Sequence, residues 1–220
     1  MPNYRISSLS LTDEAIVITL ADGQILIDPF SRDAPLKKAT LAERELWQFA
    51  DDGHGLNWPQ LWASETDEPL VSVWEILQNK IYDAALTRLE ALGWSVERLN
   101  ERDRDLIALW RAEADINNGG FLQFIGNWGL PNYHTAIAAL EKTGAPSAAA
   151  LLRSMMVLIR NYLNDPEIST PADLLNKLSD SDSDRIDELD EAFWTYPDDL
   201  TRLVVQHFGA PPQNSQQVNY

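Results

Sequence analysis

Apolar and polar residues alternate near the start of the chain in a pattern typical of β-structure. Residues 15–20 (Ala-Ile-Val-Ile-Thr-Leu) are β-branched and apolar, and a second apolar run follows at residues 25–27. Asp22-Gly23 lies between them, a dipeptide that favours tight turns between antiparallel strands. Residues 5–11 carry spaced apolar positions and are expected to add an edge strand. The pattern therefore predicts a small antiparallel sheet.

A short stretch with helical spacing follows at residues 41–49. Thr40 stands at the N-cap position and Glu43 three residues later, which is the pattern of a capping box. Asp52-Gly53-His54-Gly55 is expected to end this helix, and residues 56–59 are predicted to form a last short strand. Residues 65–69 are polar and acidic, so we place a domain boundary there. Residues 1–68 are thus predicted to form a β-rich module.

From about residue 71 the apolar period becomes helical. Amphipathic segments are predicted at residues 73–89, 106–114, 135–140, 148–163, 171–178, 184–196 and 200–208. Gly144-Ala145-Pro146-Ser147 ends one helix and begins the next. The fold class predicted is α+β, with a small β-rich N-terminal domain followed by an all-α helical domain at residues 69–208. Residues 209–220 show no apolar period and are predicted to be a flexible tail.

Charge changes this picture, because the chain is strongly acidic and the acidity is local. The formal net charge is -17. Residues 161–220 hold twelve Asp and Glu against three Lys and Arg, residues 1–70 hold twelve against five, and residues 71–160 hold ten against nine. The two ends are therefore expected to present negative surface around a balanced scaffold. Such a surface repels nucleic acid and attracts proteins with basic patches.

The composition excludes some chemistry and supports little of the rest. The chain has no Cys, which rules out disulfides, thiolate catalysis and thiolate metal sites, and its three His residues are isolated in sequence. We find no phosphate-binding glycine loop, nucleophile motif or dinucleotide fingerprint. No catalytic residue, cofactor or metal is therefore expected. Without a secretory leader or a long apolar run, the expected location is the cytoplasm, with no membrane contact.

The densest acidic segment, residues 179–191, allows two interpretations. With Asp180 as position 1 of a calcium loop, Asp182, Asp184 and Glu191 fall at acidic ligand positions. However, Arg185 stands where such a loop needs glycine. Ile186, Leu189, Phe193 and Tyr196 also share one face of an ordinary helix beginning near Asp184. We therefore favour a helix with acids at its N-terminal end and keep calcium binding as the alternative.

A motif in the middle of the chain resembles a known family. Residues 113–127 read Glu-Ala-Asp-Ile-Asn-Asn-Gly-Gly-Phe-Leu-Gln-Phe-Ile-Gly-Asn, and the spacing of acid, Asn-Gly-Gly-Phe, Gln-aromatic and Asn resembles the DNA mimic protein 19 family. The similarity extends over about residues 71–207. It implies a non-enzymatic protein that binds a basic DNA-binding partner, such as a helix-turn-helix transcription regulator of bacteria. The N-terminal segment more weakly resembles a small β-rich domain of unknown function found near toxin–antitoxin genes.

The motif itself is interpreted as structural. Two adjacent glycines allow positive φ and close backbone approach, and aromatic residues can anchor the turn in the core. We expect a corner between helices rather than a ligand site. The residues assigned to it are Glu113, Asn117, Asn118, Gly119, Gly120, Phe121, Gln123 and Asn127.

Charge mimicry has a geometric basis. Phosphates lie about 7 Å apart along a DNA strand, and carboxylates four residues apart on a helix are separated by about 6 Å of axial rise. The residues predicted to bind the partner are Asp180, Asp182, Asp184, Asp187, Glu188, Asp190, Glu191, Asp198 and Asp199. Other hypotheses stay open: acidity that serves only solubility, an antitoxin or immunity protein that neutralises a basic toxin or nuclease, and a calcium-binding or hydrolytic domain. A homodimer is also left open.

Overall fold

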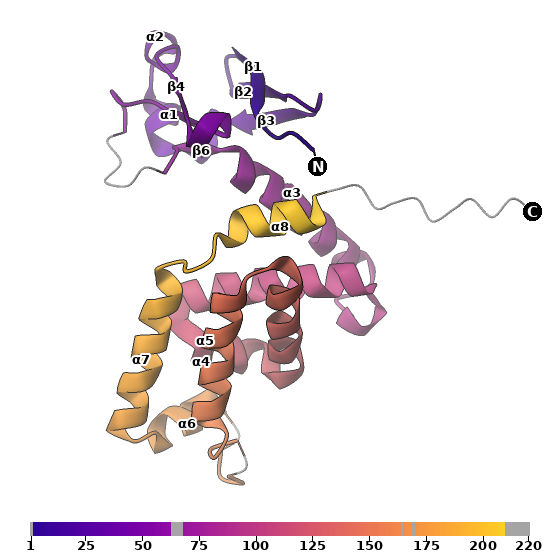
Figure 1. The fold of residues 1–220 in the computed structure, drawn as a ribbon, viewed down its shortest axis with the longest axis vertical. Helices are drawn as coiled ribbons and strands as arrows, with labels where there is room; N and C mark the ends of the chain where they lie inside the picture. Colours follow the sequence, from indigo (N-terminus) through magenta and orange to yellow (C-terminus); the bar gives the residue numbers. More distant parts are fainter. Residues whose placement is uncertain (1, 63–67, 164, 169, 210–220) are drawn as a thin grey trace, which may run out of the picture. The chain divides into compact units, whose positions relative to one another are not determined.

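The computed structural model describes residues 2–62, 68–163, 165–168 and 170–209. Within these residues the chain divides into two compact units, one ending at Lys80 and the other spanning Ile81–Phe208. The division falls inside helix α3 (Val73–Ala91). Most of the boundary predicted at residues 65–69, and nearly all of the predicted tail, lie outside the described residues. Figure 1 shows strands in the first part of the chain and helices in the rest.

The first unit begins with the predicted sheet. Strands β1 (Ile6–Leu11), β2 (Ala15–Leu20) and β3 (Ile25–Pro29) pair antiparallel in that order, with Gly23 at φ 89° in the turn between β2 and β3. Strand β2 is central, and its Ile16 and Ile18 are completely buried. The hairpin and the edge strand expected from the sequence are thus confirmed.

The second part of this unit differs from the prediction at one element. It contains α1 (Ala34–Lys38), α2 (Leu41–Arg44) and strands β4 (Gln48–Ala50), β5 (Gly55–Asn57) and β6 (Val71–Ser72), which form a second antiparallel sheet. The Thr40 capping box is present. However, the helix predicted to reach residue 49 ends at Arg44, whose carbonyl accepts a hydrogen bond from the Trp58 indole at 2.8 Å. Residues 48–50 instead pair with β5, so their backbone groups are used by the sheet.

The second unit is helical, as predicted. It holds the end of α3, then α4 (Glu101–Thr143), α5 (Pro146–Ile159), α6 (Pro171–Lys177), α7 (Asp180–Trp194) and α8 (Leu200–Phe208). Helix α7 packs against α4 and α5, beside which it runs in Figure 1. The α+β class is therefore confirmed. None of the helices in the described part of the chain is long and apolar enough to cross a membrane.

An ion pair between a partly exposed Arg88 and a buried Asp103 joins α3 to α4 in this unit. Arg88 donates two hydrogen bonds, of 2.5 and 2.6 Å, to the carboxylate of Asp103, which is almost completely buried. Although burial disfavours its charged form, the bonds from Arg88 and from the Asn100 side chain lower the pKa of Asp103 below its ordinary value. The two helices are thus fixed to each other before the glycine motif begins.

Candidate functional site

Helix α4 leaves helical geometry at the two glycines of the motif. Gly119 has φ −163° and ψ 24°, and Gly120 has φ 78° and ψ −179°. The positive φ that adjacent glycines allow is present at Gly120 but not at Gly119, whose extended φ is open to any residue. A second break, at Gly129 with φ 71°, was not predicted. The backbone therefore turns twice within this stretch of α4.

The Gly120 break exposes a backbone amide that α7 satisfies. The Phe121 N–H donates a 2.8 Å hydrogen bond to the Asp190 carboxylate. A Cβ on Gly120 would lie 2.1 Å from the other Asp190 carboxylate oxygen, so only glycine permits this approach. The buried rings of Phe121 and Phe193 also meet edge to face, with centroids 5.7 Å apart. One motif residue thus holds α7 by both its backbone and its ring.

Two further hydrogen bonds connect the same motif to the end of α7. The Trp194 indole donates to the Ile116 carbonyl at 2.9 Å. The Asn117 side-chain amide donates to the Tyr196 hydroxyl at 2.7 Å. Together with the Asp190 bond, these contacts fix the rotation of α7 about its own axis.

Asp115 organises the polar residues of the motif. Its carboxylate accepts hydrogen bonds from the Gln123 and Asn127 amides, each at 3.1 Å, and from the Trp128 indole at 2.6 Å. These donors follow the Gly120 break, so Asp115 ties the segment after the break to the helix before it. Sequence reasoning placed Asp115 in the motif but assigned it no role.

Trp128 in turn covers Arg111. The guanidinium carbon lies 3.7 Å from the centroid of the Trp128 ring, which is within the range of a cation–π interaction. Arg111 also donates to the Asn132 side chain at 2.9 Å, and burial lowers its pKa from the ordinary value. Nothing in the sequence marked Arg111 or Asn132, because their contacts form only once the chain has turned at the glycine breaks.

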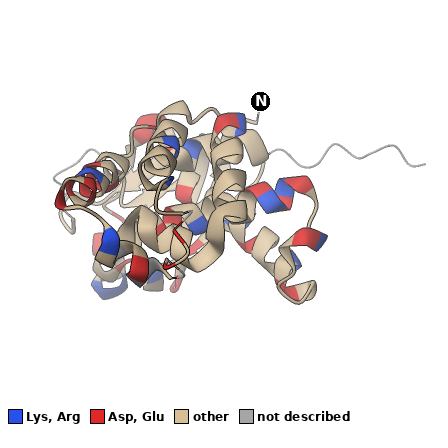
Figure 2. Cartoon of the chain, turned by 90° about the horizontal axis from the view of Figure 1, so that it is seen from below, with Lys and Arg blue, Asp and Glu red and all other residues tan. Residues whose placement is uncertain are grey.

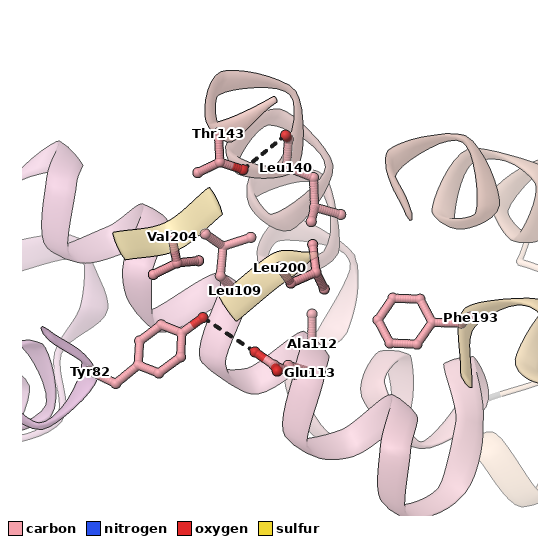
Figure 3. A pocket seen from close by; sticks show the side chains of 9 residues that line it. All are labelled: Tyr82, Leu109, Ala112, Glu113, Leu140, Thr143, Phe193, Leu200 and Val204. Carbon is pink, nitrogen blue, oxygen red and sulfur yellow. Dashed lines mark hydrogen bonds between the residues drawn. The ribbon is translucent and has the colours of Figure 1, made fainter. Parts of the chain in front are cut away.

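Of the remaining motif residues, Glu113 faces a small pocket and Asn118 is exposed. Glu113 accepts a long hydrogen bond, 3.4 Å, from the Tyr82 hydroxyl (Figure 3). The other lining residues are mostly apolar, among them Leu109, Leu140 and Val204. The cavity volume is about 10 Å³, about the least that accommodates one water molecule. This pocket is too small for a metabolite.

Four acidic residues of α7 lie together on one exposed face of the helix. Residues spaced four, three and four apart share one helix face, and this face carries exposed Asp180, Asp184, Asp187 and Glu191, which we call the acidic stripe. Among the described residues none of the four has a cationic partner. Buried Ile186, Leu189 and Phe193 lie on the opposite face. Figure 2 shows the acidic residues in red.

The other acids predicted to bind a partner have contacts within the protein. Glu188 is exposed but pairs with Arg185, and Asp182 accepts a hydrogen bond from the Tyr162 hydroxyl. Asp198 accepts the Ala148 amide at 2.8 Å, and Asp199 accepts the Arg202 amide at 3.0 Å. These two carboxylates cap α5 and α8, respectively. Only part of the predicted set is therefore brought together on one free face.

The segment with calcium-loop spacing is continuous helix. Helix α7 begins at Asp180, four residues before the predicted start, because the Ser179 side chain accepts the Asp182 amide as an N-cap. In a helix the carboxylates at positions 180, 184 and 191 project in one row rather than converging on a point. No group of three or more His, Asp or Glu among the described residues is arranged to hold a metal ion.

Comparison with known families gives the second unit an identity. The DMP19-like protein family matches residues 97–208, which include the glycine motif, the acidic stripe and just over half of the chain. The chain belongs to the DMP19-like family. No curated protein and no solved structure matches it. The DMP19-like match does not reach the β-rich unit, so the resemblance predicted for the N-terminal segment stays a prediction.

The contact between Gly120 and Asp190 can be tested by glycine substitution. We expect Gly120→Ala to lower the free energy of unfolding by about 2–4 kcal/mol, because alanine adds both backbone strain and a clash with Asp190. Gly93→Ala is the matched control, since Gly93 has φ 66° with open space where a Cβ would lie, and should cost about 1–2 kcal/mol. Urea denaturation measures both. Equal losses in the two variants would contradict a specific Asp190 contact.

The half-buried Asp190 predicts a pH dependence. Burial raises its pKa above the ordinary value, the Phe121 amide lowers it, and Asp187 raises it further, with a net increase. The stability that a raised carboxyl pKa contributes is full below the unfolded-state pKa and is lost as pH rises through the folded-state pKa. Asp190→Asn removes this titration but keeps an oxygen to accept the Phe121 amide.

We therefore expect the stability of Asp190→Asn relative to wild type to increase as pH rises from about 3 to 7. Denaturant unfolding at several pH values measures the difference. Asp184→Asn is a control for loss of charge on the same helix, because Asp184 is exposed and does not contribute to the pKa shift of Asp190. A difference between Asp190→Asn and wild type that does not change with pH would contradict the assigned environment.

Proposed function

We propose that this protein is a non-enzymatic DNA mimic of the cytoplasm, which binds a basic DNA-binding protein and blocks its access to DNA. A helix-turn-helix transcription regulator is the kind of partner expected. Membership of the DMP19-like family supports this proposal, and the acidic stripe is the observation on which it depends. A homodimer stays a prediction.

The stripe has the electrostatic properties that mimicry requires. Its four carboxylates are exposed and unpaired among the described residues, so their charge is available to a partner rather than balanced internally. Their helix is held rigidly through Phe121, Ile116 and Asn117, so a partner does not have to order it on binding. A basic DNA-binding face is complementary to such a row and is steered toward it over a distance of about one Debye length.

The glycine motif supports a scaffold function rather than catalysis. Several of its polar side chains are bonded to other side chains of the protein: Asp115 accepts hydrogen bonds from Gln123, Asn127 and Trp128, and Asn117 donates one to Tyr196. A catalytic group needs a free approach to a substrate atom. We therefore assign these residues to the positioning of α7.

Neutralising the stripe tests the proposal. The variant changes Asp180, Asp184, Asp187 and Glu191 to Asn or Gln, and should keep the wild-type melting temperature because all four side chains are exposed. We expect it to lose at least tenfold in affinity for a DNA-binding protein captured from bacterial lysate by the wild type. Binding of the wild type should weaken steeply with added salt.

The control variant neutralises four exposed acids outside α7, namely Asp13, Glu45, Asp83 and Glu90, and so has the same net charge as the stripe variant. Adding wild-type or control protein at increasing concentration should release the captured partner from its DNA. Adding the stripe variant should not. Release by all three proteins would show that net charge alone acts. A captured nuclease whose activity is blocked would instead indicate the antitoxin or immunity hypothesis.

A further inference from the structure

The acidic stripe ends in an aromatic residue on the same helix face. Asp180, Asp184, Asp187 and Glu191 are spaced four, three and four residues apart, and Trp194 follows after three more. Positions with this spacing form a nearly straight row along a helix. Trp194 is 46% exposed, so its ring continues the row at the surface.

The ring of Trp194 is held in place. Its indole N–H is bonded to the Ile116 carbonyl, which leaves the exposed part of the ring with a fixed orientation. Tyr196 follows closely, is 49% exposed, and its hydroxyl accepts a hydrogen bond from Asn117. Both aromatic residues are thus anchored to consecutive residues of the glycine motif. A fixed ring loses little entropy when a partner binds to it.

We propose that this face of α7 docks a basic α-helix that presents arginine, with one guanidinium lying on the Trp194 ring. This inference rests on the proposed function and specifies the chemistry of the partner. Charge complementarity selects a basic occupant, since four unpaired carboxylates line the row and Glu191 lies one turn from Trp194. A second copy of this chain would instead place like charges opposite one another.

Arginine satisfies both parts of this face better than lysine. Its planar guanidinium stacks on aromatic rings and can bond a neighbouring carboxylate through its edge at the same time. The lysine ammonium is a strongly hydrated point charge that gains less from an exposed ring. Carboxylates alone would accept either residue, so a preference for arginine is the distinctive property that Trp194 adds.

A helical occupant follows from the straightness of the row. Basic side chains with the same four-three spacing on a partner helix would meet successive carboxylates without bending either backbone. An extended segment with a rise of about 3.3 Å per residue would pass the whole row within about six residues and bring fewer side chains to it.

Designed peptides test the inference without knowledge of the natural partner. Alanine-rich helical peptides carry arginine at four-three spacing, lysine at the same positions, or the same arginines distributed around the helix. We expect wild-type protein to bind the arginine peptide about two- to fivefold more tightly than the lysine peptide by calorimetry, which is the range of an exposed cation–π contact. The distributed peptide should bind more weakly than either.

Substitutions then locate the preference. Trp194→Leu should bind both ordered peptides equally, at about the affinity of the lysine peptide, whereas Trp194→Phe should keep part of the preference for arginine. Trp62→Leu is the control, because Trp62 is 47% exposed and lies in the β-rich unit. Melting temperatures confirm that each variant is folded.

Three results would overturn the inference. Equal binding of the arginine and lysine peptides to wild type, or a preference that survives Trp194→Leu, would remove Trp194 from recognition while leaving charge mimicry intact. Binding of neither ordered peptide would show that this face does not dock a basic helix. The proposed function is judged separately, by release of the captured partner from DNA.

Discussion

The way in which α7 is oriented in the helical unit depends above all on one hydrogen bond, from the Phe121 amide to the Asp190 carboxylate. The break at Gly120 frees this amide from the helix, and a buried amide without a partner is costly. Because glycine has no side chain, the carboxylate can approach the backbone closely enough to satisfy it. With Asp190 turned inward, the acidic stripe must face outward. The same hydrogen bond thus gives the amide left free at the Gly120 break a partner, and it determines which face of α7 points outward.

How far the sequence predicts the fold depends on which interactions are local. The hairpin around Gly23 and the buried positions Ile186, Leu189 and Phe193 of α7 follow from turn chemistry and helical period, and both are confirmed. The assignment of Tyr196 to the same apolar face was wrong, because α7 ends at Trp194 and the Tyr196 side chain is 49% exposed. The end of α2 was missed because it depends on Trp58, fourteen residues away. Asp190 was grouped with the outward acids because its inward role depends on the backbone of Gly120, which periodicity within α7 does not show.

The acidity of the chain is not all of one kind. Asp103 is buried and forms an ion pair with Arg88, Asp115 accepts the hydrogen bonds that join the two parts of the glycine motif, and Asp198 and Asp199 cap helices. These carboxylates would be needed in a protein with no charged partner at all. The net charge of the chain therefore counts more carboxylates than a partner can contact. The unpaired acids of α7 give a better measure of the charge available for mimicry. The glycine motif and the stripe are also linked physically, since the motif positions the helix that bears the charge.

The length of the stripe limits what it can imitate. From Asp180 to Glu191 the helix rises about 16 Å, which corresponds to about five phosphate steps of one DNA strand when each step is measured as about 3.4 Å of rise along the duplex axis. Four carboxylates over that length approach the charge density of a single strand but not of a duplex. A partner that bound only through this row would meet many equally acidic helices among other proteins. Selectivity must therefore come from features beside the charges, and the anchored ring of Trp194 is such a feature at the end of the row.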